Sequence, residues 1–173
     1  MRPFELDARR DGFQVVREAA QRLKDYYVAL PADGGREISA ADLRGAPLVL
    51  YFYPRGNTSG CTREAEQFRD LYDAFRAAGA EVVGVSRDSV RKHDAFKKKV
   101  GIPFPLLADG EGGLCEAMGV WTEKSMYGRT YMGIERSTFL VDGDGVIREA
   151  WRKVKVPGHA EVVLASLKEM TGV

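Results

Sequence analysis

Residues 54–61 have the sequence PRGNTSGC and end in a cysteine, Cys61, at a position where the backbone is expected to make a thiol reactive. The stretch lies between a continuous apolar run and a long amphipathic segment, so we expect Cys61 in the first turn of a helix that follows a buried strand. The positive end of the helix dipole and the unpaired backbone N–H groups of that turn favour the thiolate over the thiol. Cys61 is therefore the candidate nucleophile.

The neighbours of Cys61 fit a shaped, partly dry pocket. The Thr58 hydroxyl can face the sulfur or a substrate oxygen, while Pro54 restricts the loop and shields the sulfur from water. For an arbitrary lone cysteine, the commoner interpretation is a small buried apolar residue. The turn-forming residues at this strand-to-helix junction favour the reactive interpretation, because functional residues concentrate in such loops.

Other residues with metal-binding or redox chemistry are few. Cys115 is the only other cysteine and forms no CxxC pair, and His93 and His159 are isolated, so we expect neither a metal nor an organic cofactor. Basic residues cluster at 91–93 and 97–99. With a net charge of +1 we interpret them as a solvated face, and we expect no binding to nucleic acid.

The composition is that of a globular protein. With 173 residues and 45% hydrophobic residues the chain fits a single domain over 1–173, with residues 1–25 as an N-terminal helical extension. The first residues lack the apolar segment of a signal peptide, and no stretch is long enough to span a membrane. We expect a cytoplasmic, monomeric protein.

Strands and helices alternate along the chain. We predict helices over 13–27, 61–78, 88–100, 114–118 and 162–170, and strands over 48–53, 81–86 and 105–109. Residues 32–35 form a turn between two short strands, and Ser39 caps a brief helical turn. A loop rich in Gly, Tyr and Met then precedes a hairpin over 137–151 that turns at 142–145. This order predicts an α/β protein with a thioredoxin-like fold, in which helices flank a mixed central sheet.

The stretch YFYPRGNTSGCTREAEQFRD resembles the peroxiredoxin signature Pro-x-x-x-Thr-x-x-Cys, and specifically that of the Q-type subfamily, the bacterioferritin comigratory proteins. The similarity continues through ISAADLRGAPLVLYFYP, EVVGVSRDS, FPLLAD, GVWTEKSMYGRTYMGIERSTFLVD and VVLASLKE, over about residues 26 to 170. The resemblance implies that Cys61 attacks a hydroperoxide, with Pro54 and Thr58 as its loop partners.

The same resemblance assigns Arg136 as the family's arginine, which by spacing alone would be an ordinary surface charge. Its guanidinium would stabilise the thiolate and polarise the departing oxygen. Further candidates for the substrate pocket are Ser59, Gly60, Met126 and Tyr127.

The chain departs from the family pattern at two positions. Ser59 stands where proline is common, and Glu66 stands five residues after Cys61, where many Q-type members place a resolving cysteine. Cys115 is then the only intramolecular candidate for resolution, and its alternative interpretation is a core cysteine beside Leu114 and Met118.

We therefore expect a one-cysteine thiol peroxidase that reduces hydrogen peroxide and organic hydroperoxides, with thioredoxin, glutaredoxin or a small thiol as reductant. Two alternatives remain: a peroxidase that uses Cys115 as the resolving cysteine, and a redox sensor or binding module that signals to a partner through a mixed disulfide. A thioredoxin-like disulfide reductase is disfavoured, because it would need a second cysteine near Cys61.

Overall fold

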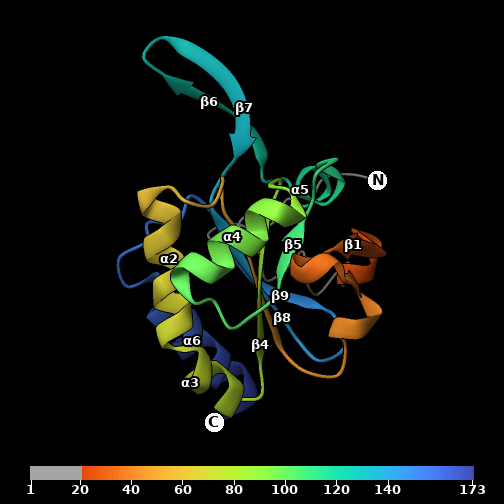
Figure 1. Ribbon diagram of the computed structural model, residues 1–173. Coiled ribbons are helices and arrows are strands. Elements are labelled where there is room, and N and C mark those ends of the chain that lie inside the picture. The colour runs from red at the N-terminus through yellow and green to blue at the C-terminus, as the bar shows by residue number, and fades with distance from the viewer. Residues whose placement is uncertain (1–20) are drawn as a thin grey trace.

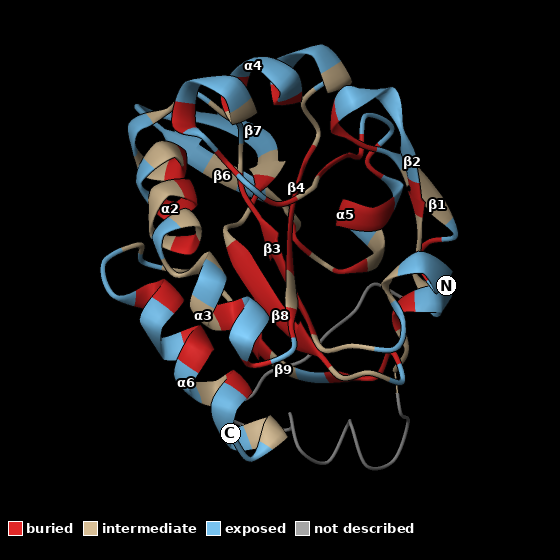
Figure 2. Ribbon diagram, turned by 60° about the horizontal axis from the view of Figure 1, so that its bottom comes forward, coloured by how far each residue is buried: buried red, intermediate tan, exposed pale blue. Residues whose placement is uncertain are grey.

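A computed structural model describes residues 21–173 (Figure 1). Its centre is a five-stranded mixed sheet in the order β5-β4-β3-β8-β9. Strands β3 (Leu48–Phe52), β4 (Glu81–Ser86) and β5 (Leu106–Ala108) are parallel, whereas β8 (Ser137–Val141) and β9 (Ile147–Trp151) are antiparallel to their neighbours. β3 is apolar throughout because both faces of the sheet are covered (Figure 2). The predicted mixed sheet is confirmed.

Helices cover the two faces of the sheet: α2 (Ser59–Asp70), α3 (Tyr72–Ala77), α4 (Val90–Val100), α5 (Gly113–Ala117) and α6 (His159–Thr171). Helix α4 ends at Val100 as predicted and begins two residues after the predicted start at 88. The Ser89 hydroxyl accepts from Lys92 N, and Gly101 adopts the left-handed conformation. The helix predicted over 61–78 is instead two helices, because the backbone breaks at Leu71. No helix within residues 21–173 is long and apolar enough to cross a membrane.

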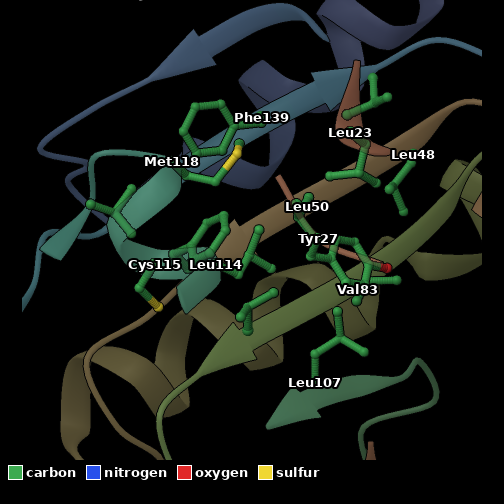
Figure 3. Close-up of a cluster of buried hydrophobic side chains, with 14 of the residues drawn as sticks. Leu23, Tyr27, Leu48, Leu50, Val83, Leu107, Leu114, Cys115, Met118 and Phe139 are labelled. Atoms are coloured by element: carbon green, nitrogen blue, oxygen red, sulfur yellow. The ribbon is translucent and has the colours of Figure 1, made fainter. Parts of the chain in front are cut away.

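Successive side chains of β3 point to opposite faces of the sheet, so the core is divided into two clusters, one on each face. Val49, Tyr51 and Tyr53 join Cys61 and the apolar sides of α2, α4 and α6, which we call the Cys61-side cluster. Leu48, Leu50 and Phe52 join Cys115 and the N-terminal segment, which we call the Cys115-side cluster (Figure 3). The two cysteines therefore belong to different cores.

The N-terminal part of the described chain closes the Cys115-side cluster. Strands β1 (Ala29–Pro31) and β2 (Glu37–Ser39) pair around a short 3-10 turn, η2 (Asp33–Gly35), as predicted. The Ser39 hydroxyl accepts from Asp42 N at 3.0 Å and caps the turn η3 (Ala41–Leu43).

Most of the helix predicted over 13–27 lies outside the described residues. The prediction is wrong for residues 21–27, which contain no α-helix but only the 3-10 turn η1 (Leu23–Asp25). Arg22 forms an antiparallel bridge with Val146, and Leu23 N donates to Gly145 O at 2.8 Å. These bonds tie the segment to the β8–β9 turn, in place of the i→i−4 bonds of a helix.

The region predicted as a Gly-, Tyr- and Met-rich loop is a two-stranded hairpin. Strands β6 (Trp121–Met126) and β7 (Arg129–Ile134) pair with each other and project from the body of the molecule (Figure 1). Tyr127 and Gly128 connect them with φ values of 51° and 77°. Positive φ at both positions is typical of a type I′ turn, for which Asn-Gly is the usual sequence signal. Because this chain has Tyr-Gly there, the sequence did not predict the turn.

Candidate active site

Cys61 occupies the place predicted for it. Thr58 is the N-cap of α2 with φ −94° and ψ 157°, and Cys61 is the third residue of the helix. Thr62 N donates to Thr58 O at 2.9 Å and closes the first turn. Cys61 is 1% exposed, so the helix dipole acts on the sulfur in a medium that screens charge weakly.

The loop before α2 is fixed by α4 and the turn that precedes it. Gly56 N donates to Asp88 Oδ2 at 2.7 Å, and Lys99 Nζ donates to Asn57 Oδ1. A Cβ at Gly56 would lie 2.9 Å from Phe96 Cγ, so only glycine allows this approach. The position of the Cys61 loop therefore depends on residues 32 to 42 positions away in sequence.

Arg136 reaches the sulfur from the segment between β7 and β8. Its Nη2 donates to Cys61 Sγ at 3.4 Å, across 75 positions of sequence. A Cβ on Gly60 would lie 3.2 Å from this nitrogen, so Gly60 makes room for the guanidinium over the first turn of α2. Burial lowers the pKa of Arg136, but the charges of Glu64 and Cys61 outweigh it and the net pKa is raised. Arg136 is thus a permanent cation beside the sulfur.

Glu64 is a member of this site that sequence reasoning missed. Arg136 Nη1 donates to Glu64 Oε1 at 2.7 Å, and the Glu64 side chain is 1% exposed. Burial raises the pKa of Glu64 to about 7, although Arg136 opposes the shift. The signal in the sequence was a carboxylate three residues after Cys61, on the same helical face as Ala65 and Phe68.

The wall of the site toward the sheet is aromatic. Tyr51 stacks on Phe68 with ring centroids 4.6 Å apart, and both rings are fully buried. Among residues 21–173, the Tyr51 hydroxyl and Glu64 Oε2 are two of the few buried polar atoms without a hydrogen-bond partner. Burial, then the charges of Tyr53, Glu64 and Cys61, raise the pKa of Tyr51. The Tyr51 hydroxyl therefore lies close enough to Glu64 and Cys61 to respond to their charges.

The other predicted residues have different positions. Pro54 is half-buried in the loop, whereas Ser59 is exposed. The Thr58 hydroxyl donates to Arg55 O at 3.1 Å, which leaves its oxygen free to accept. Met126 and Tyr127 lie at the far end of the β6–β7 hairpin, exposed to solvent, so the structure does not bring them to the sulfur.

Cys115 lies apart from this site. It is fully buried in α5 beside Leu114 (Figure 3). Its cluster lies on the opposite face of the sheet from that of Cys61. Its backbone N donates to Asp109 Oδ2 at 2.8 Å. Burial, and then the Asp109 charge, raise the pKa of the Cys115 thiol far above its usual range. In residues 21–173 no group of three or more His, Cys, Asp or Glu side chains is placed to hold a metal ion.

A helix-borne cysteine beside a partly buried arginine, on a mixed sheet flanked by helices, defines a thioredoxin-like protein with a nucleophilic thiol centre. Residues 20–150 match the model of the AhpC/TSA family. The chain is 51% identical over 143 residues to peroxiredoxin Bcp of Xanthomonas campestris, covering 83% of this chain and 89% of that one. It is 46% identical over 154 residues to peroxiredoxin Bcp of Bacillus subtilis, covering 89% and 97%.

Solved structures give the same result. Xanthomonas campestris peroxiredoxin Q matches with a TM-score of 0.83 and 46% identity, over 88% of this chain and 98% of that chain. The chain therefore belongs to the AhpC/TSA family and, within it, to the Bcp (peroxiredoxin Q) peroxiredoxins, which are thiol peroxidases. The predicted thioredoxin-like fold is confirmed.

Proposed function

We propose that this enzyme reduces both hydrogen peroxide and organic hydroperoxides at Cys61. The observation that carries the proposal is the pairing of a buried cysteine in the first turn of α2 with the Arg136 guanidinium at 3.4 Å. The thiolate attacks the terminal oxygen of ROOH, so an S–O bond forms while the O–O bond breaks. The products are a Cys61 sulfenic acid and RO⁻, which takes up a proton. A related structural study concerns alkyl peroxide reduction by the Xanthomonas campestris bacterioferritin comigratory protein, which supports the inclusion of organic substrates.

Each neighbour has a role in this step. Arg136 stabilises the negative charge that passes from sulfur to the departing oxygen, and Glu64 holds the guanidinium in position. The Thr58 oxygen, whose proton is donated to Arg55 O, accepts the hydrogen bond of the hydroperoxide O–H. Pro54 covers the loop side of the sulfur. We propose a monomer as the working unit.

We propose a one-cysteine cycle in which an external thiol reduces the sulfenic acid. One thiol condenses with it to a mixed disulfide and water, and a second thiol releases the Cys61 thiolate. Three observations support this proposal. Cys115 is buried on the other face of the sheet, its raised pKa keeps it a thiol rather than a nucleophilic thiolate, and Glu66 replaces the usual nearby cysteine. Thioredoxin, glutaredoxin and small thiols are the candidate reductants.

The test is to oxidise the pure protein with one equivalent of peroxide and measure its intact mass, with and without a sulfenic-acid trap. We expect a trapped adduct on Cys61, and we expect Cys115→Ser to turn over as the wild type does. A mass loss of about 2 Da in the native protein that Cys115→Ser abolishes, together with lost turnover, would show that Cys115 resolves. Cys61→Ser is the matched control and must lose all thiol-driven peroxide consumption.

A further inference from the structure

The β6–β7 hairpin, residues 121–134, which we call the arm, carries most of the exposed large apolar side chains. Seven large hydrophobic side chains in residues 21–173 are exposed: Val28, Met126, Tyr127, Tyr131, Met132, Val162 and Val173. Four of the seven lie on the arm, which has no neighbouring strand on either edge. A two-stranded hairpin is marginally stable by itself in water. An arm that exposes apolar groups and unpaired strand edges in this way has the properties of an interaction surface.

Tyr127, in the turn of the arm, adopts a backbone conformation that tyrosine disfavours. Its φ of 51° lies in the left-handed region, which costs a residue with a bulky side chain about 1 kcal/mol or more. Its side chain is 99% exposed, so no contact within the chain offsets this cost. Asparagine is favoured at the first position of such a turn. A contact with a partner outside the chain would offset this cost.

The base of the arm adjoins the Cys61 site, because β7 ends at Ile134, two residues before the arginine that contacts the sulfur. The register pairs Lys124 with Tyr131 and Met126 with Arg129, so these four side chains share a face. The Lys124 side chain lies along Gly133, where a Cβ would be 3.2 Å from Lys124 Cδ. Burial, then repulsion from Arg136, lower the pKa of Lys124, while Cys61 and Glu135 oppose the shift. Lys124 thus lies close enough to feel the charges of the site.

The charge of this face has one sign. It carries Lys124 and Arg129 but no carboxylate, because Glu123 pairs with Met132 on the opposite face. Lys153 and Lys155 are exposed near the base of the arm, since Val154 between them donates its N–H to Arg136 O at 3.0 Å, and Glu135 is the carboxylate at this base. The whole chain has a net charge of only +1, so this is a local concentration of positive charge. It complements a partner whose contact surface is acidic and partly apolar.

We infer that the face of the arm formed by Lys124, Met126, Arg129 and Tyr131, with Tyr127 at its tip, is the docking surface for a dithiol reductase protein with acidic and apolar groups around its cysteines. The inference rests on the proposed external-thiol cycle. The first thiolate of the partner attacks the Cys61 sulfenic acid: an S–S bond forms, the S–O bond breaks, and the departing hydroxide takes up a proton from solvent to become water. Its second thiolate then displaces Cys61, so the partner leaves as a disulfide and Cys61 returns as thiolate. Because the sulfur is 1% exposed, a partner held on the arm is retained until the first turn of α2 opens.

The test compares two electron donors at saturating peroxide: a thioredoxin of net negative charge, recycled by its reductase, and dithiothreitol. The variant is Tyr127→Asn, which removes the aromatic side chain and suits the turn. We expect kcat/KM for thioredoxin to fall about tenfold, as for the loss of one interface anchor, and dithiothreitol-driven turnover to stay at the wild-type level. Val162→Ser, an exposed apolar residue on α6 with 52% exposure, is the matched control and should leave both rates unchanged.

Three outcomes would overturn the inference. In the first, Tyr127→Asn leaves the rate with thioredoxin unchanged. In the second, it slows turnover with both donors equally, which would assign the arm to the peroxide step or to folding. In the third, the wild type is a dimer in sedimentation and Tyr127→Asn converts it to a monomer, which would make a second copy of the chain the occupant of the arm. Added salt gives an independent readout, since the wild-type rate with thioredoxin should fall as ionic strength rises and the rate with dithiothreitol should not. Wild-type protein that fails with dithiothreitol as well would refute the peroxidase cycle rather than the docking surface.

Discussion

Replacing Glu64 with glutamine tests whether the buried ion pair serves catalysis at a cost in stability. Burial raises the pKa of Glu64 from 4.5 to about 7 despite the Arg136 partner at 2.7 Å, which corresponds to about 3 kcal/mol of penalty on the ionised form in the folded state. A folded-state pKa above the unfolded value stabilises the protein below pH 4.5, and this contribution is lost as the pH rises to about 7. Glutamine resembles the neutral acid at every pH.

We therefore expect Glu64→Gln to have nearly wild-type stability at pH 5 and to be more stable than the wild type at pH 8, by as much as about 3 kcal/mol. The peroxide reaction should nevertheless slow about tenfold at pH 8, because Arg136 exchanges a charge-assisted hydrogen bond for a neutral one worth about 1 to 1.5 kcal/mol less. The gap in rate should narrow below pH 7, where Glu64 of the wild type becomes protonated.

Two assays measure these effects. Urea unfolding at pH 5 and pH 8 gives the stabilities, and stopped-flow oxidation of the reduced protein by peroxide gives the rates. Alkylation of Cys61 by a neutral reagent over the same pH range separates ionisation of the sulfur from an effect on Arg136. A variant that is less stable than the wild type at pH 8, or that keeps the wild-type peroxide rate, would refute the reasoning.

Three further changes follow from the geometry. Arg136→Ala should slow peroxide reduction by about 100-fold or more but alkylation of Cys61 far less, and equal losses in the two reactions would leave Arg136 with no role in the transition state. Gly60→Ala should favour the helix yet slow the peroxide reaction about fivefold to tenfold, because its Cβ would displace the guanidinium; unfolding and stopped-flow measurements would contradict this if both were unchanged. Burial, then the Arg136 charge, lower the pKa of His159 to about 4, so stability should fall as the pH drops from 6.5 to 4, and His159→Gln should reduce that fall in urea unfolding.

Much of the fold was predictable because local signals agree with the tertiary structure. The apolar run of β3 and the Ser89 and Gly101 caps of α4 correspond directly to the observed elements. The arm was missed because its residues are exposed or half-buried except for Ile134, so its strands show no alternation between a buried apolar face and an exposed polar face. Its turn also has a tyrosine where asparagine is the usual signal.

The site was predictable in part, for a similar reason. Cys61 has a local signal, since the residues before it form a strand-to-helix loop. Arg136 lies 75 positions away, and only the family resemblance singled it out. Glu64 has a local signal, since it is a carboxylate on a buried helical face. Its role in the site, however, depends on its ion pair with Arg136, which belongs to another part of the chain. Spacing along a chain does not contain that information.

The position of Cys61 also imposes a condition on regeneration. The burial that strengthens the Arg136 interaction with the sulfur excludes any thiol large enough to form a disulfide, because such a thiol must reach a sulfur that is 1% exposed. The first turn of α2 must therefore open, which breaks the Thr62–Thr58 bond, the Arg136–Cys61 contact and the Gly56–Asp88 bond.

At about 1 kcal/mol for each such bond, opening costs a few kcal/mol, and the open form is about one molecule in a hundred to one in a thousand. Oxidation favours this opening, since a neutral sulfenic acid loses the attraction between thiolate and guanidinium. The charge that prepares Cys61 for attack is thus removed by the reaction itself, at the step where the sulfur must become accessible.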